Sequence, residues 1–146
     1  MESYHSRCLK ILLNYPDIKV LTKIKTDALI REIIQKYQSV GINDIHYLWL
    51  YSDKIPMTQV RMTPDELLGF YKKNLLNLLE KLSSTSVLYL IIDCSDGRFI
   101  ACSSTSKNYM DLLIDNYFDF DEIYFVGKIK ELLLCVNHVF EVIPFN

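Results

Sequence analysis

Apolar and polar residues follow different spacings along the first part of the chain, and each spacing predicts one element. The apolar run at residues 8–14 predicts a strand, and residues 18–25 alternate as a half-buried strand does. Tyr15-Pro16-Asp17 between them favours a turn. In residues 18–25 the buried face would carry Ile18, Val20, Thr22 and Ile24, and the lysine-rich outer face Lys19, Leu21, Lys23 and Lys25. After Thr26, the expected cap, apolar residues recur at helical spacing up to Tyr37. We therefore expect a hairpin followed by a helix.

The clearest local signal lies at residues 63–67. Thr63 can cap the free amides of a helix, Pro64 suits the first helical position, and Glu66 can reach back to the Thr63 amide. Apolar positions continue from there to Leu82. A long central helix is predicted over about residues 64–82. Before it, residues 45–51 predict a strand rich in aromatic and aliphatic side chains.

The second part of the chain starts with another hairpin. Residues 87–94 are almost all apolar, as in a central strand, and residues 99–103 return after a turn at Asp96-Gly97. The patterns then predict a helix at 106–118, a strand at 122–126, a helix at 128–138 and a strand at 140–145. The sequence thus predicts an α+β fold. Its single domain spans residues 1–146, with two ββα-like halves (1–82 and 87–146) and helices packed on a mixed or antiparallel sheet.

Composition agrees with one ordered domain, because half of the residues are hydrophobic and 23% are charged. The net charge of −2 is unevenly distributed. Residues 1–82 hold twelve Lys and Arg against nine Asp and Glu, whereas residues 83–146 hold four against nine. Such polarity can steer a partner protein or favour self-association, so a homodimer is one expectation.

Cysteine usage and the N-terminal residues bear on the compartment. No apolar leader opens the chain, and the longest apolar runs are too short to cross a bilayer. We expect an intracellular protein of the cytoplasm or nucleus, with no membrane attachment and with reduced thiols. A two-residue turn at Asp96-Gly97 would place Cys94 and Cys102 on opposite sheet faces. Ile, Lys, Asn and Tyr are abundant and are encoded by AT-rich codons, which indicates an AT-rich genome such as that of a large DNA virus, a protist, a microsporidian or a yeast. A viral or parasite factor acting on host proteins is therefore one expectation.

Two His and Cys pairs have the spacing of zinc ligands. They are His5-x-x-Cys8 and Cys135-x-x-His138. Cys135 lies in the apolar run Leu132–Val136, which a buried cysteine acting as a small hydrophobic residue explains better. We predict neither a metal nor a cofactor.

The alternative function is that of a Mg²⁺-dependent nuclease. Asp93 ends a buried strand, and Asp119, Asp121 and Glu122 cluster later in the chain. Carboxylates at a strand end can hold Mg²⁺ for phosphodiester cleavage. The segment Leu90–Arg98 also resembles the first hairpin of ribonuclease-H-like folds.

The favoured function is that of a non-enzymatic protein–protein interaction module, such as a small subunit or an adaptor. Tyr and Trp are common at interfaces, and one strand face here would carry three aromatic side chains beside an apolar helix. The expected partner-binding residues are Tyr47, Trp49, Tyr51, Phe70, Tyr71, Lys19, Lys23 and Lys25. Nucleic acid is not an expected partner, because the chain is acidic and no aromatic residues are interleaved with these lysines.

Overall fold

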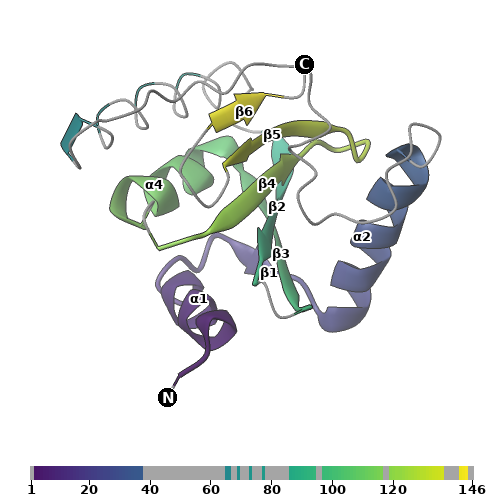
Figure 1. Cartoon of the computed structure of the whole chain (residues 1–146), viewed down its shortest axis with the longest axis horizontal. Coiled ribbons are helices and arrows are strands. Elements are labelled where there is room, and N and C mark those ends of the chain that lie inside the picture. The colour runs from purple at the N-terminus through teal and green to yellow at the C-terminus, as the bar shows by residue number, and fades with distance from the viewer. Residues whose placement is uncertain are drawn as a thin grey trace.

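The structure is a computed structural model of the 146-residue chain. It describes residues 2–37, 65, 66, 69, 73, 77, 86–94, 97–116, 119–136 and, for the backbone, 142–144. Within these ranges an antiparallel sheet has helices on both faces, α1 and α4 on one and α2 on the other (Figure 1). The predicted α+β class is confirmed.

The described elements are three helices and six strands. In chain order they are α1 (Tyr4–Leu12), β1 (Lys19–Val20), α2 (Lys23–Tyr37), β2 (Val87–Asp93), β3 (Phe99–Thr105), α4 (Ser106–Asn116), β4 (Glu122–Val126), β5 (Leu132–Val136) and β6 (Val142–Pro144). The strand order is β1-β3-β2-β4-β5-β6, and every neighbouring pair is antiparallel. Helix α4 carries the chain from β3 past β2 to β4.

The two sheet faces hold separate hydrophobic clusters because side chains alternate along each strand. From β2, Leu90 and Ile92 pack with Cys8 of α1 and Leu112 of α4. Ile91 faces the other way and packs with Leu29 and Ile33 of α2. Burial on both faces explains why residues 87–94 are almost uniformly apolar.

The first part of the chain differs from the prediction, because residues 8–14 lie mostly in α1 and not in a strand. Ser3 caps this helix by accepting a hydrogen bond from the Ser6 amide at 3.1 Å. Cys8 and Leu12, one turn apart, are the buried positions. A short apolar run suits a buried helix face as well as a strand. The ββα order predicted for the first half is therefore wrong in the described residues.

The predicted strand at 18–25 is reduced to the two residues of β1, because α2 begins at Lys23. The Lys25 amide donates to the Thr22 hydroxyl at 3.3 Å, so Thr22 caps the helix. Thr26, the expected cap, is instead a buried residue inside α2.

The second part agrees closely with the prediction for β2, β3, α4 and β4, while β6 lies inside the predicted 140–145 strand. The predicted helix at 128–138 is wrong. Residues 127–131 form a turn, with Lys130 at φ 66°, and Leu132–Val136 form strand β5. A five-residue apolar run fits a strand between two covered faces, which the sequence pattern cannot separate from a buried helix.

The β2–β3 register also differs from the expected two-residue turn. Asp93 pairs with Phe99, and the Cys94 amide donates to the Arg98 carbonyl at 3.0 Å, so the connection is longer. As a result Cys94 and Cys102 belong to the same core cluster and do not lie on opposite faces. All four cysteines are free thiols.

Most of the predicted central helix at 64–82 lies outside the described residues. Asp65, Glu66, Gly69, Lys73 and Asn77 have helical backbone and are exposed. The rest of this helix, and the strand at 45–51, stay predictions. Among the helices that can be described, none is long and apolar enough to cross a membrane.

Candidate binding site

Residues 19–25, which we call the β1–α2 corner, join the sheet edge to the second helix. Ile18 is buried and anchors the chain just before the corner. The Leu21 amide then donates to the Ala101 carbonyl of β3 at 2.8 Å, which extends the attachment beyond β1. With Thr22 capping α2, the chain changes direction over a few residues and leaves its side chains at the surface.

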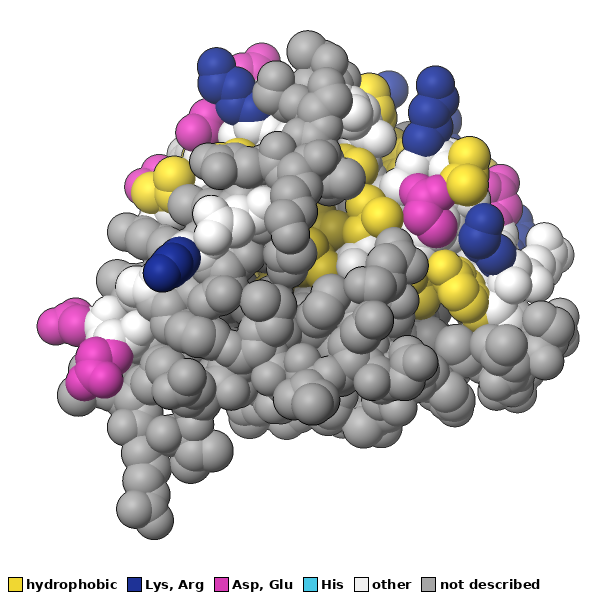
Figure 2. Space-filling model, turned by 90° about the horizontal axis from the view of Figure 1, so that it is seen from above, with side chains coloured by type: hydrophobic (Ala, Val, Ile, Leu, Met, Phe, Trp, Pro, Cys, Tyr) yellow, Lys and Arg dark blue, Asp and Glu magenta, His cyan; other side chains and the backbone are white. Residues whose placement is uncertain are grey.

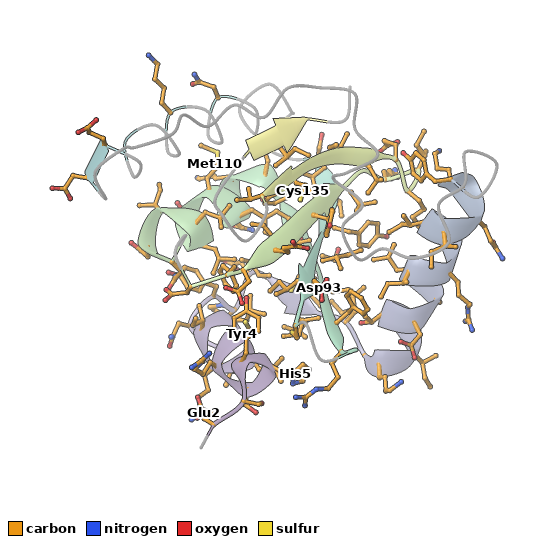
Figure 3. The ribbon with its side chains drawn as sticks, in the orientation of Figure 1. Glu2, Tyr4, His5, Asp93, Met110 and Cys135 are labelled. Carbon is orange, nitrogen blue, oxygen red and sulfur yellow. The ribbon has the colours of Figure 1, made fainter. Side chains whose placement is uncertain are left out.

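Beside the corner is a cavity of about 350 Å³, which we call the α1–α2 cleft. Its walls include Leu9 of α1, Leu21 after β1, and Phe99 and Ile100 of β3. Charged or polar side chains at the cleft include His5, Lys23, Asp27 and Arg98. Figure 3 shows His5 on the side of α1 that faces the β2–β3 turn. The cleft is therefore an apolar hollow with mainly basic groups around it.

Two hydrophobic side chains of the corner are exposed. Ile24 is 81% exposed in the first turn of α2, and Val20 is 39% exposed and contributes to the cleft. Single exposed apolar residues are ordinary, but Val20 lines the apolar cleft and Ile24 follows the lining residue Lys23 directly in the chain, so one partner can cover both. The alternating pattern of residues 18–25 had predicted Ile24 as a buried strand residue, so sequence reasoning missed it.

The predicted lysine face is split in the structure. Lys23 lies at the α1–α2 cleft and pairs with Asp27 at 2.9 Å, one turn along α2. Lys19 and Lys25 line a different cavity, on the α2 face of the sheet. All three lysines are exposed. The prediction that they share one strand face is wrong, because the helix begins between Lys19 and Lys25.

The five aromatic residues predicted to bind a partner all lie outside the described residues. They are Tyr47, Trp49, Tyr51, Phe70 and Tyr71. Their role stays a prediction.

The acidic residues of the nuclease alternative are partly brought together. Asp93 of β2 is the direct cross-strand partner of Glu122 of β4, and the two residues are only 4% and 6% exposed. The Tyr124 hydroxyl donates to Glu122 Oε2 at 3.5 Å. Asp119 and Asp121 are exposed instead. In the described part of the chain, no three or more His, Cys, Asp or Glu side chains gather as metal ligands.

The two His and Cys pairs are separated by the sheet. Cys8 packs in the cluster under α1 and α4, whereas Cys135 packs in the cluster under α2. His138 lies outside the described residues. Since Cys8 and Cys135 lie on opposite faces, they do not belong to one zinc tetrahedron.

The thiols differ in acidity for reasons of local contact. A hydrogen bond with Cys94 lowers the pKa of the Cys8 thiol, against the opposing effect of burial. Burial, followed by the nearby charge of Glu122, raises the pKa of Cys135 well above its usual value. A thiol with a raised pKa is a poor nucleophile, so Cys135 is a packing residue.

Comparisons of the chain with known protein families, curated proteins and solved structures found no match.

Proposed function

We propose that the protein is a non-enzymatic protein-binding module, whose partner docks at the α1–α2 cleft and covers the β1–α2 corner. The observation that carries this proposal is the 81% exposure of Ile24 beside a cavity of about 350 Å³. Covering Ile24, Val20 and the apolar cleft wall removes apolar surface from water, which favours association by roughly 25 cal/mol per Å².

The charges near the cleft define the chemistry of the partner. Lys23 and Arg98 outnumber Asp27 there, and Lys19 and Lys25 extend the positive charge along the corner. A complementary partner presents one aliphatic side chain for the cleft and neighbouring Asp or Glu side chains for the basic groups. Such charges accelerate encounter and select the partner more than they tighten the complex. We therefore propose an acidic protein segment with an aliphatic anchor.

A peptide-display selection against the whole protein tests this proposal. Enriched peptides should combine an aliphatic residue with Asp or Glu, and fluorescence anisotropy on a synthesised peptide gives its affinity. Ile24→Glu should weaken binding at least about tenfold, because it places an acidic group against an acidic partner and removes an apolar contact. Glutamate is compatible with the first helical turn, so the fold should be kept.

The matched control is Leu13→Glu, which alters an equally exposed apolar residue at the end of α1. This variant should bind the selected peptide as the unchanged protein does. Selection of peptides without acidic residues, or equal weakening by both variants, would contradict the proposal.

A further inference from the structure

A second cavity, of about 330 Å³, lies between α2 and the sheet near the β1 edge. We call it the lysine groove. One cross-strand row is part of its lining, because Ser103 of β3 pairs with Lys19 of β1 on one side and with Tyr89 of β2 on the other. Lys25, Ala28 and Glu32 of α2 line it from the helix. Lys130, from the turn between β4 and β5, completes the lining.

The position of Lys130 is defined by several contacts. Its amide donates to the Gly127 carbonyl at 3.0 Å, within a turn that gives Lys130 a φ of 66°. Its ammonium group lies 4.7 Å from the centre of the Tyr89 ring and 3.7 Å from Glu32 Oε2. The Lys130 side chain is only 25% exposed. This cation is therefore held over the groove and is partly shielded from water, which strengthens its attraction for an anion.

The wall opposite the sheet is also fixed. The Lys36 ammonium donates to the Ile129 carbonyl at 3.2 Å, and the Leu132 amide donates to the Tyr37 hydroxyl at 2.8 Å. These contacts attach the C-terminal part of α2 to the turn that carries Lys130. A groove whose walls are already attached loses little conformational entropy when it takes up a ligand.

The charge of the groove is positive, with three lysines against Glu32. Figure 2 shows basic, acidic and hydrophobic side chains interspersed on the α2 side of the molecule. The volume of the groove falls within the range of small-molecule sites. Its polar groups are three ammonium ions, the Ser103 and Tyr89 hydroxyls and the Glu32 carboxylate. The ammonium ions and hydroxyls can bind phosphate oxygens, while Leu21 and the Tyr89 ring offer apolar contact.

We propose that the lysine groove binds a small organic phosphate, with the phosphate between Lys19, Ser103 and Lys130 and the organic part against Leu21 and Tyr89. The groove shares Leu21 with the α1–α2 cleft, and its Lys19 and Lys25 belong to the β1–α2 corner. The inference does not rest on the protein-binding proposal, because Ser103 and Lys130 line the groove and not the cleft. A small dicarboxylate shares the double negative charge and is the competing ligand class.

Phenyl phosphate is a suitable probe because it joins a phosphate dianion to one ring. Titration of the ¹⁵N-labelled full chain should shift the amide signals of Lys19, Ser103 and Lys130 with one saturating curve. Lys130→Met should lower the affinity for phenyl phosphate about tenfold, which is the loss expected for one charge-assisted hydrogen bond. Lys19→Met should also lower the affinity for phenyl phosphate, and because the Lys19 side chain is exposed the fold should be kept.

The matched control is Lys107→Met, which removes an exposed lysine from α4 on the other sheet face and should leave the affinity unchanged. Benzenesulfonate, with one negative charge, should bind more weakly than phenyl phosphate. The proposal is overturned if phenyl phosphate does not saturate at millimolar concentration or if Lys130→Met and Lys107→Met bind it equally. It is also overturned if succinate binds more tightly than phenyl phosphate.

Discussion

The Tyr4 hydroxyl accepts a hydrogen bond from the Asp121 amide at 2.7 Å, although the two residues are 117 positions apart in the sequence. This contact attaches the first turn of α1 to the segment that enters β4. Tyr4 also packs at the edge of the cluster that contains Cys8 and Phe120, and burial strongly raises the pKa of its hydroxyl. Together with buried Cys8 and Leu12, this long-range contact holds α1, and with it one wall of the α1–α2 cleft, against the sheet.

Tyr4→Phe should lower the free energy of unfolding by about 1 kcal/mol, because the ring is kept while the Asp121 amide loses its acceptor. Urea denaturation followed by far-UV circular dichroism measures the change. Tyr15→Phe is the control: the Tyr15 hydroxyl donates to the exposed Asp115 carboxylate and accepts from the Asn116 side-chain amide at 2.9 Å. Both partners are side chains that can turn to water, whereas the Asp121 amide is fixed in the backbone, so the loss of the Tyr15 hydroxyl should cost less. Equal destabilisation by the two variants would show that the Tyr4 hydrogen bond stabilises the fold no more than the contacts of the Tyr15 hydroxyl do.

Thr22→Ala should destabilise the protein by about 1 kcal/mol, because it removes the side-chain acceptor at the start of α2. Thr22→Ser keeps the hydroxyl and should restore most of the stability. Urea midpoints of the three proteins give the comparison. If Thr22→Ser and Thr22→Ala were equally destabilised, the capping hydrogen bond would not be the cause.

Stability should fall at alkaline pH because buried acids are held in their neutral forms. Burial raises the pKa of the Cys102 thiol from its usual 9.0 to about 12. Since the folded-state pKa is the higher one, the contribution of Cys102 is complete below pH 9.0 and is lost as the pH rises toward about 12. From this thiol alone the free energy of unfolding should decrease by at most about 1.4 kcal/mol per pH unit in that window.

Urea denaturation of the unchanged protein and of Cys102→Ala, from pH 7 to pH 11, checks this dependence. Cys102→Ala should show a smaller decrease between pH 9 and pH 11, although buried Tyr109, whose pKa burial also raises, keeps part of the effect. Identical slopes for the two proteins would exclude Cys102 as a source of alkaline instability.

The hypothesis of an interaction module came from the aromatic residues and the lysines of the chain, and only the lysines can be placed. Lys19, Lys23 and Lys25 are exposed as expected, but they serve two different cavities. Ile24 and Lys130 became candidate residues only from the fold. Ile24 occupied an apparently buried strand position, and Lys130 lay inside a predicted helix, so no local pattern marked either one.

The sequence by itself determined the α+β class and the elements whose pattern allows one interpretation. Strand β2 and helix α4 are of this kind. The long apolar run of β2 and the helical spacing of apolar residues in α4 each match the burial that the fold gives them. Tertiary structure alone decided whether Cys8–Leu12 and Leu132–Val136 form helix or strand. A short apolar run can be buried in either conformation, provided that another layer of the fold packs against it. It also decided which side chains meet across the sheet, as Asp93 and Glu122 do, because strand order and register arise from contacts between distant segments.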